Sequence, residues 1–240
     1  SGSTASLRIF TERNSMPPKA MPRTTEVKQP AARRWSTTEA VRADLLDAAR
    51  VVFAKHGFAE ASVTEVVERA GSSVGSLYHH FGSKTDLFLA LYERHYEEQR
   101  QIARTAVAAA RQAGVTDPFD LFVAGARAYL EATWSRRDLV RIFQLGDTPP
   151  GFHEVQRRGG RAWLGANFKL LGGENDAVHR VLVWLVTSFI GEARREIAKS
   201  RSGRAASAHV NAMIDVLERM RPIITGDLGI ELSYEDDDDE

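Results

Sequence analysis

The segment from Ser62 to Leu87 constrains the fold of this chain more than any other. It reads SVTEVVERAGSSVGSLYHHFGSKTDL and predicts two short helices joined by a tight turn, followed by the start of a third helix. Ser62 and Glu65 have the spacing of a capping box, in which a hydroxyl and a later carboxylate satisfy the first backbone amides of a helix. Gly71 stands where a helix end favours a left-handed residue, and either serine after it can cap the next helix. This pattern is typical of a helix–turn–helix unit, which places its second helix in the DNA major groove.

The second helix of the unit, expected over residues 74–79, starts with small residues and continues into aromatic ones. Gly75 allows close approach of the backbone, Val74 can pack on a thymine methyl, and Ser76 can reach a base edge or a phosphate. Base readout is expected to be sparse, because none of these is an Arg or Asn, whereas neighbouring polar groups suit phosphates. For His80 a partly buried, structural histidine is an equal alternative. The residues expected at the DNA interface are Ser62, Thr64, Ser73, Val74, Gly75, Ser76, Tyr78, His79, His80 and Lys84.

This segment resembles the DNA-binding domain of the TetR family of bacterial transcriptional regulators. The family usually has Ile-Ala in place of Val66-Val67 and a valine in place of Ser72. The resemblance implies an all-helical protein with an N-terminal DNA-reading domain and a C-terminal domain that binds an inducer and forms a dimer. It also implies that Tyr78 and Lys84 are the firmest phosphate contacts. The residues that carry the resemblance are Phe53, Gly57-Phe58, Thr64, Ala70-Gly71, Gly75, Leu77-Tyr78, His80-Phe81, Ser83-Lys84 and Leu87.

Composition bounds the remaining classes of protein. With 240 residues, 43% of them hydrophobic, the chain can bury a core in one or two domains. The absence of cysteine excludes disulfides and thiolate metal sites and suits the cytoplasm. The longest apolar run, residues 181–190, is about half of the roughly 20 residues that a membrane span needs. We expect no cofactor, no metal and no membrane association. His79, His80 and His95 lack the spacing of metal ligands.

Charge is unevenly distributed although the formal net charge is zero. Basic residues dominate the first 34 positions, which also carry scattered prolines and no apolar period, so this segment is expected to be a disordered basic arm. Such an arm either follows DNA or only keeps the chain in solution. The domains are therefore expected at residues 1–34 (basic N-terminal arm), 35–83 (helix–turn–helix), 84–226 (regulation, ligand binding and dimerisation) and 227–240 (acidic tail).

Helical periodicity continues through the rest of the chain, with no alternating pattern that would indicate strands. The first helix is expected from about Thr37, with Ser36 and Glu39 as a capping box. The helix over 84–113, roughly 40 Å long at 1.5 Å per residue, would join the DNA-binding domain to the remainder. The fold class is all-α, with about nine helices. The other expected helices cover 118–134, 137–145, 152–171, 174–199 and 205–220.

Aromatic residues gather between residues 122 and 184, together with several polar side chains. A cavity with an aromatic lining and few polar groups is the usual site for a small apolar or aromatic ligand. The alternative is that these aromatics only fill a helical core. Residues 146–151 are either a lid or an ordinary connection. The candidate ligand-binding residues are Phe122, Arg127, Trp134, Phe143, Gln144, His153, Trp163, Asn167 and Trp184.

The last two long helices carry more apolar surface than one intramolecular contact normally covers. Two such helix pairs can form a four-helix bundle across a two-fold axis, which predicts a homodimer. The alternative is burial inside the chain's own domain. The predicted interface residues are Val178, Val181, Leu182, Leu185, Phe189, Val210, Met213, Ile214 and Leu217.

These features favour a homodimeric repressor that a small molecule releases from a palindromic operator. An activator, or a global DNA-organising protein without an inducer, is the alternative. No nucleophile elbow, phosphate-binding loop or paired carboxylates with a supporting context indicate an enzyme.

Overall fold

The computed structural model describes residues 31–172 and 177–226, which form α-helices and contain no strand. The expectations for residues 1–30 of the arm and for the acidic tail lie outside the described residues. None of the described helices is long and apolar enough to cross a membrane. The helices are α1 (Ala31–His56), α2 (Val63–Arg69), α3 (Val74–Phe81), α4 (Lys84–Gln112), α5 (Pro118–Ser135), α6 (Arg137–Gln144), α7 (Phe152–Leu171), α8 (Ala177–Lys199), α9 (Gly203–Arg219) and α10 (Arg221–Ile224).

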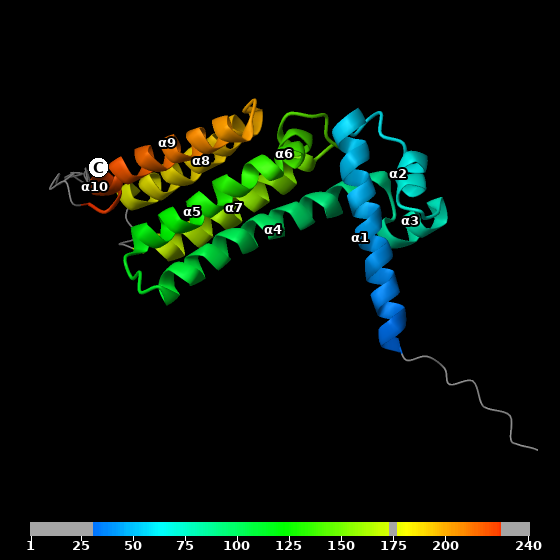
Figure 1. Ribbon diagram of the computed structural model, residues 1–240, viewed down its shortest axis with the longest axis horizontal. Coiled ribbons are helices and arrows are strands. Elements are labelled where there is room, and N and C mark those ends of the chain that lie inside the picture. The colour runs from blue at the N-terminus through cyan, green and yellow to red at the C-terminus, as the bar shows by residue number, and fades with distance from the viewer. Residues whose placement is uncertain (1–30, 173–176, 227–240) are drawn as a thin grey trace, which may run out of the picture.

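Helix α1 begins six positions earlier than the sequence pattern predicted. Its first residue is Ala31, so Ser36 and Glu39 fall inside the helix and the capping box expected there is wrong. The Ala-Ala-Arg-Arg sequence of residues 31–34 consists of strong helix formers, and this local propensity moves the helix start into the segment expected to be an arm. In Figure 1, α1 extends well past the ends of α2 and α3.

The caps of α2 and α3 are those that the sequence predicted. The hydroxyl of Ser62 accepts a hydrogen bond from the Glu65 amide at 3.4 Å, and that of Ser73 accepts one from the Ser76 amide at 3.1 Å. Gly71 has a φ of +61°, the left-handed conformation that ends a helix at low cost for glycine. Leu77, with no exposed surface, anchors α3 against α1 and α2.

The core of the α1–α3 unit is completed by residues from later in the chain. The ring centroid of Phe88 in α4 lies 5.2 Å from that of Phe143 in α6 and 5.1 Å from that of Phe152 in α7. Phe53 of α1 packs on Phe88 from the other side, also at 5.2 Å. The aromatic cluster formed by Phe53, Phe88, Phe143 and Phe152 therefore joins the N-terminal helices to the regulatory part in one core.

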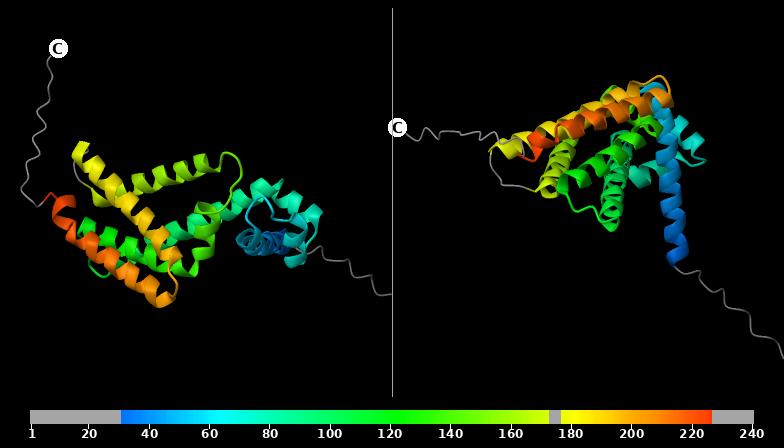
Figure 2. Two further views of the ribbon diagram at one scale, coloured as in Figure 1. Left: turned by 90° about the horizontal axis from the view of Figure 1, so that it is seen from above. Right: turned by 60° about the vertical axis from the view of Figure 1, so that its left-hand side comes forward.

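The remaining helices form layers around α5. Figure 1 shows α8 and α9 along one flank, α5 and α7 in the middle and α4 on the opposite flank. In both views of Figure 2 the α1–α3 unit lies at one end of the molecule, with α4 running from it into the other helices. A second core, which includes Leu130, Ile197 and Ile214, fills the space between α5, α8 and α9. The short α10, which the sequence pattern did not predict, follows α9 directly.

Candidate DNA interface and ligand cavity

The residues predicted to read DNA lie mostly on the surface of α2 and α3. Thr64, Gly75 and His79 are exposed, and Val74 and Tyr78 keep 42% and 47% of their surface exposed. On this short helix the large exposed side chains and the glycine form one accessible face, as a major-groove contact requires.

Four of the remaining candidates have structural roles as well. Ser62 and Ser73 accept amide hydrogen bonds as caps, which leaves each hydroxyl proton free to be donated. Ser76 and His80 are half-buried. The alternative raised for His80, a partly buried histidine, agrees with this exposure.

Lys84 contacts its own chain more than the sequence suggested. Its ammonium donates hydrogen bonds to the carbonyls of Ala59 at 2.9 Å and Ala61 at 3.2 Å, and lies 4.9 Å from the centroid of the Phe58 ring. An ammonium has three N–H donors, so one remains for a phosphate. Lys84 thus fixes the loop between α1 and α2, on which any phosphate contact would depend.

The loop between α6 and α7 is bound to that same α1–α2 loop. The Asp147 carboxylate accepts hydrogen bonds from the amides of Phe58 at 2.9 Å and Ala59 at 2.5 Å. The pKa of Asp147 is lowered chiefly by the Ala59 amide, and further by the Phe58 amide and Lys84, against a smaller effect of burial. Gly57 has a φ of +75°, and a Cβ there would collide with the Asp147 carboxylate. Residues 146–151 thus contact the α1–α2 loop through Asp147, and this contact does not decide between a lid and an ordinary connection.

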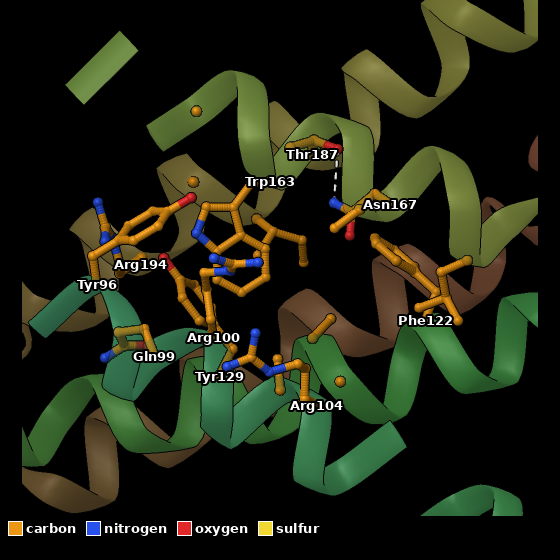
Figure 3. A pocket seen from close by; sticks show the side chains of 18 of the residues that line it. Tyr96, Gln99, Arg100, Arg104, Phe122, Tyr129, Trp163, Asn167, Thr187 and Arg194 are labelled. Carbon is orange, nitrogen blue, oxygen red and sulfur yellow. Dashed lines mark hydrogen bonds between the residues drawn. The ribbon is translucent and has the colours of Figure 1, made fainter. Parts of the chain in front are cut away.

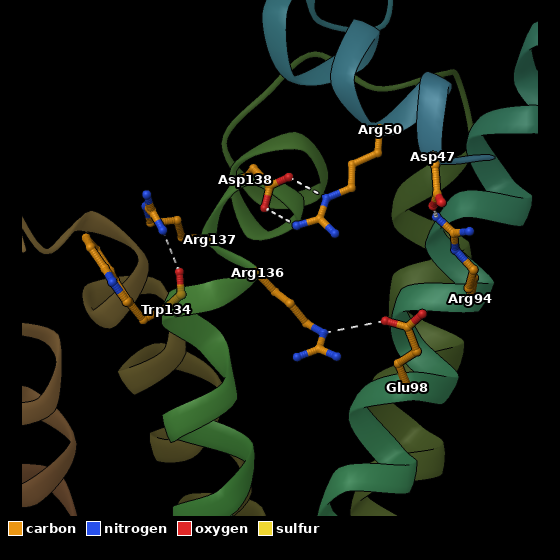
Figure 4. Close-up of polar contacts among 8 residues, drawn as sticks. All are labelled: Asp47, Arg50, Arg94, Glu98, Trp134, Arg136, Arg137 and Asp138. Atoms are coloured by element: carbon orange, nitrogen blue, oxygen red, sulfur yellow. Dashed lines mark hydrogen bonds and ion pairs between the residues drawn. The ribbon is translucent and has the colours of Figure 1, made fainter. Parts of the chain in front are cut away.

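Ion pairs connect α1, α4 and α6 beside this loop. Figure 4 shows the guanidinium of Arg50 in α1 facing the carboxylate of Asp138 in α6, with contacts of 2.6 and 2.8 Å. Burial raises the pKa of Asp138, but the hydrogen bonds and charge of Arg50 outweigh it, so this pKa lies below its ordinary value. Arg94 of α4 also reaches α1 through Asp47, at 2.7 Å.

A cavity of about 850 Å³ lies between α4, α5, α7 and α8, with the end of α6 at its margin. This volume suits a drug-sized molecule. The Asn167 amide donates to the Thr187 hydroxyl at 2.9 Å across the cavity wall (Figure 3). Five of the nine predicted ligand-binding residues line the cavity: Phe122, Gln144, His153, Trp163 and Asn167.

The other four predicted ligand-binding residues do not line it. Phe143 is 3% exposed and belongs to the aromatic cluster instead. Arg127 turns toward α9, where it donates to Asn211 at 3.1 Å. Trp134 lies beneath the guanidinium of Arg137, 4.1 Å from the ring centroid. Trp184, 59% exposed, is on the outer face of α8.

Two buried polar residues of α4, which the sequence reasoning missed, face the cavity. Gln99 is 1% exposed and both its amide atoms lack a hydrogen-bond partner, and Nδ1 of the 3% exposed His95 is also unpartnered. Burial lowers the pKa of His95 to about 3, helped by the charges of Arg194, Arg136 and Arg50. The spacing of these residues was the signal that could have found them. Leu87, Leu91, His95 and Gln99 follow one another at four-residue intervals and so lie on one face of the helix, where the two polar residues continue an apolar stripe.

Helix α7 approaches α4 closely because of a glycine. The hydroxyl of Tyr96 donates to the Gly159 carbonyl at 2.7 Å. A Cβ at Gly159 would lie 3.1 Å from the Tyr92 hydroxyl and from the Tyr96 ring, too tight for a larger residue without displacement. Gly159 therefore permits the close contact between α7 and α4, and the adjacent Gly160 lines the cavity.

The predicted dimer residues divide into an exposed and a buried set. On α8, Val181 is 60% exposed and Leu185 is 42% exposed, and they flank the exposed Trp184. By contrast, Val210, Ile214 and Leu217 of α9 are at most 3% exposed, because they pack on α5 and α8 of the same chain, so they are wrong as interface residues. The half-buried members of the set are Val178, Leu182, Phe189 and Met213.

Comparisons with known proteins place the N-terminal helices in a family. Residues 45–91 match the family described as bacterial regulatory proteins, tetR family. The transcriptional repressor AcnR of Corynebacterium glutamicum is 48% identical over 50 residues, which are 21% of this chain and 27% of AcnR. A crystallised TetR-family regulator from Pectobacterium atrosepticum is 26% identical with a TM-score of 0.52, covering 79% of this chain and 96% of that one. Residues 45–91 are thus a DNA-binding domain of the TetR family.

Sequence similarity to the curated relatives is confined to the DNA-binding end of this chain. The transcriptional activator FasR of Mycolicibacterium smegmatis is 43% identical over 68 residues, and the matches span only 27% of AcnR and 31% of FasR. The regulator FadR from Bacillus subtilis, in complex with stearoyl-CoA, shares the fold with a TM-score of 0.58 and 16% identity over 73% of this chain. The fold is thus shared over most of the chain, whereas sequence similarity to the curated relatives covers only its DNA-binding end.

Proposed function

We propose that this protein is a homodimeric, DNA-binding transcriptional regulator that a small molecule in the cavity releases from a palindromic operator. The observation that carries the proposal is the position of α6. Asp138 near its start holds α1 through Arg50, while Gln144 at its end lines the cavity. A ligand that moves α6 would therefore move the α1–α3 unit as well.

The DNA contact is supported by the exposed face of α2 and α3. We assign base contacts to Thr64, Val74 and Gly75 and phosphate contacts to Tyr78 and Lys84, the latter through its remaining N–H group. A single short helix reads too few base pairs for specific binding, and a dimer presents two such helices about 34 Å apart, one turn of DNA. Such a protein acts on the chromosome in the bacterial cytoplasm.

The dimer contact is best supported on the outer face of α8. Val181, Trp184 and Leu185 are separated by three and four positions, so they form one exposed apolar stripe, with Val216 of α9, 45% exposed, on the neighbouring helix. Apolar side chains gathered in this way indicate an interaction surface. A second copy of the chain is the partner that a symmetric operator reader requires.

Ligand control is supported by the cavity and by its connections. An apolar or aromatic part of a ligand would pack on Trp163, Tyr129 and Phe122, all of which line the cavity. Release requires that the ligand binds the two arrangements of the dimer with different affinity, typically a coupling of about 1–3 kcal/mol. The cavity argues against a global DNA-organising protein without an inducer. Activation remains the alternative to repression, because FasR is an activator and AcnR a repressor.

The experiment that tests the DNA-binding part is an operator selection from random duplexes with the purified full-length protein. We expect a palindrome, whose binding weakens strongly with Tyr78→Ala and hardly changes with Val51→Ala, an exposed apolar residue of α1 outside the reading helices. Titration at two salt concentrations measures the number of phosphate contacts. A steep salt dependence without any enriched sequence would contradict specific regulation.

A further inference from the structure

The charge around the cavity is strongly one-sided. Seven lining residues are Lys or Arg and none is Asp or Glu. Four of these cations have carboxylate partners outside the lining: Arg100 and Arg104 pair with Glu97, Arg157 with Glu154, and Arg195 with Glu192. Four of the seven lining cations thus share three carboxylates, and the other three cations have no carboxylate partner among the described residues.

The remaining lining cations are Arg111, Lys169 and Arg194, for which the described part of the chain supplies no ion pair. Arg111 and Lys169 lie in the last turns of α4 and α7, where a cation also balances the helix dipole. Arg194 has no such explanation. It lies within α8, 5.9 Å above the Tyr129 ring, and its buried Nε has no hydrogen-bond partner.

A second set of unpartnered polar atoms lines the same cavity as Arg194. His95 is a member of this lining, and the charge of Arg194 contributes to its low pKa. Gln99 follows His95 by four positions, one helical turn, and lines the same cavity with both amide atoms unpartnered. Buried polar groups nearly always have partners, so an unpartnered amide and guanidinium at one cavity indicate a polar group that a ligand supplies.

We propose that the ligand is an amphipathic anion: an aromatic or aliphatic body that ends in a carboxylate, sulfonate or phosphate. Its acidic group accepts hydrogen bonds from Arg194 and from the Gln99 amide, a charge-assisted arrangement that arginine favours. Its body lies along Trp163 and Tyr129, which both line the cavity (Figure 3) and contact each other edge to face with their ring centroids 5.2 Å apart. This inference rests on the proposed function and specifies the class of molecule that the cavity takes.

The test compares two fluorescent dyes with the same ring systems, anilinonaphthalene sulfonate and its uncharged parent phenyl naphthylamine. Both are titrated into the full-length protein without DNA. We expect the sulfonate to bind about tenfold more tightly, the effect of one charge-assisted hydrogen bond. Arg194→Gln should remove most of this preference and leave the uncharged dye unchanged. Arg161→Gln, an exposed position on α7 outside the lining, is the matched control and should change neither affinity.

Thermal unfolding and operator binding of each variant verify that the fold is intact, and Arg194→Lys, which keeps the charge but loses Nε, should retain part of the preference. Equal affinity for both dyes, or a preference that survives Arg194→Gln, would overturn the anionic ligand while leaving the cavity as a ligand site. If neither dye binds to protein that still binds its operator, the ligand-controlled part of the proposed function fails as well.

Discussion

Arg50 of α1 donates two hydrogen bonds to Asp138 of α6, from Nε at 2.6 Å and from a terminal nitrogen at 2.8 Å. This two-point contact fixes both the distance and the orientation between the helices, which a single hydrogen bond does not. Arg94–Asp47 and the contact of Asp147 with the α1–α2 loop lie on either side of it. The α1–α3 unit is therefore attached to the regulatory helices at several polar points besides the continuous α4.

The Arg50–Asp138 pair can be measured by a double-mutant cycle with Arg50→Gln and Asp138→Asn. Because each side chain is about one third exposed, solvent screens the pair, and we expect a coupling of about 0.5–1 kcal/mol in the free energy of unfolding. Urea denaturation provides the values. The exposed pair Arg157–Glu154 within α7 is the control and should couple by a few tenths of a kcal/mol. Equal coupling in the two cycles would contradict a special role for the first.

Gly57→Ala is expected to destabilise the protein for two separable reasons. Its φ of +75° strains any residue with a Cβ, and the Cβ would collide with Asp147. We expect Gly57→Ala to lower the free energy of unfolding by about 2–3 kcal/mol in the wild-type background. When Asp147→Ala has removed the collision, only the backbone strain remains, and we expect a loss of about 1–2 kcal/mol. Chemical denaturation of the four proteins measures this. Identical losses in both backgrounds would mean that the loop does not lie against Gly57.

Buried His95 predicts a particular pH dependence of stability. Its pKa in the folded protein is about 3, against an ordinary value of 6.5, so between these values the unfolded chain binds a proton that the folded chain does not. Stability therefore decreases as the pH falls from about 6.5 toward 3. Arg194, Arg136 and Arg50 strengthen this effect, and Asp138 opposes it.

Replacing His95 by Leu should flatten the free energy of unfolding between pH 6.5 and about pH 5, above the range in which carboxylates titrate. Denaturant titrations across this range provide the measurement. An unaltered slope in the His95 variant would show that this residue is protonated equally in the two states.

A charged residue on the outer face of α8 should separate the proposed dimer into monomers. Leu185→Glu places a carboxylate within the exposed stripe formed with Val181 and Trp184, where pairing would bury it next to its symmetry mate. We expect a monomer in sedimentation-velocity measurements, with weaker operator binding. Val51→Glu, an equally exposed apolar position on α1, should leave the assembly unchanged. A dimer that persists with Leu185→Glu would assign the interface to another surface.

Gln99→Met should raise the stability of the ligand-free protein and lower its affinity for the ligand. An unpartnered buried amide costs about 1–3 kcal/mol, which an apolar side chain of similar size removes, so we expect a gain of about 1 kcal/mol in unfolding free energy. The sulfonate dye should lose affinity in parallel. Opposite changes in stability and binding are the signature of a residue kept for its ligand, whereas a stability loss would indicate an unseen structural partner.

Local signals in the sequence were sufficient for the DNA-binding helices and for most helix boundaries. Ser62, Gly71 and Ser73 act on backbone groups no more than four positions away, so their roles can be predicted from the sequence without knowledge of the fold. Composition could not separate Phe143 and Trp184 from the cavity-lining Trp163, because all three are aromatic residues in one stretch of helices. Tertiary packing decides which face of each helix turns inward. The same packing buries Ile214 within its own chain.

Phe53 of α1 contacts Phe88 of α4 across the boundary expected near residue 84, and Phe88 in turn contacts Phe143 and Phe152, so residues 35–83 do not have a core of their own. A chimera joined at Ser83 would keep only Phe53 of this aromatic cluster and place it against the side chains of another protein, whereas one that also carried the start of α4, α6 and the start of α7 would keep the cluster whole. The proposed operator-reading and ligand-sensing ends of this protein therefore share one aromatic cluster, and new specificities cannot be assembled from the two halves unless the side chains of this cluster match.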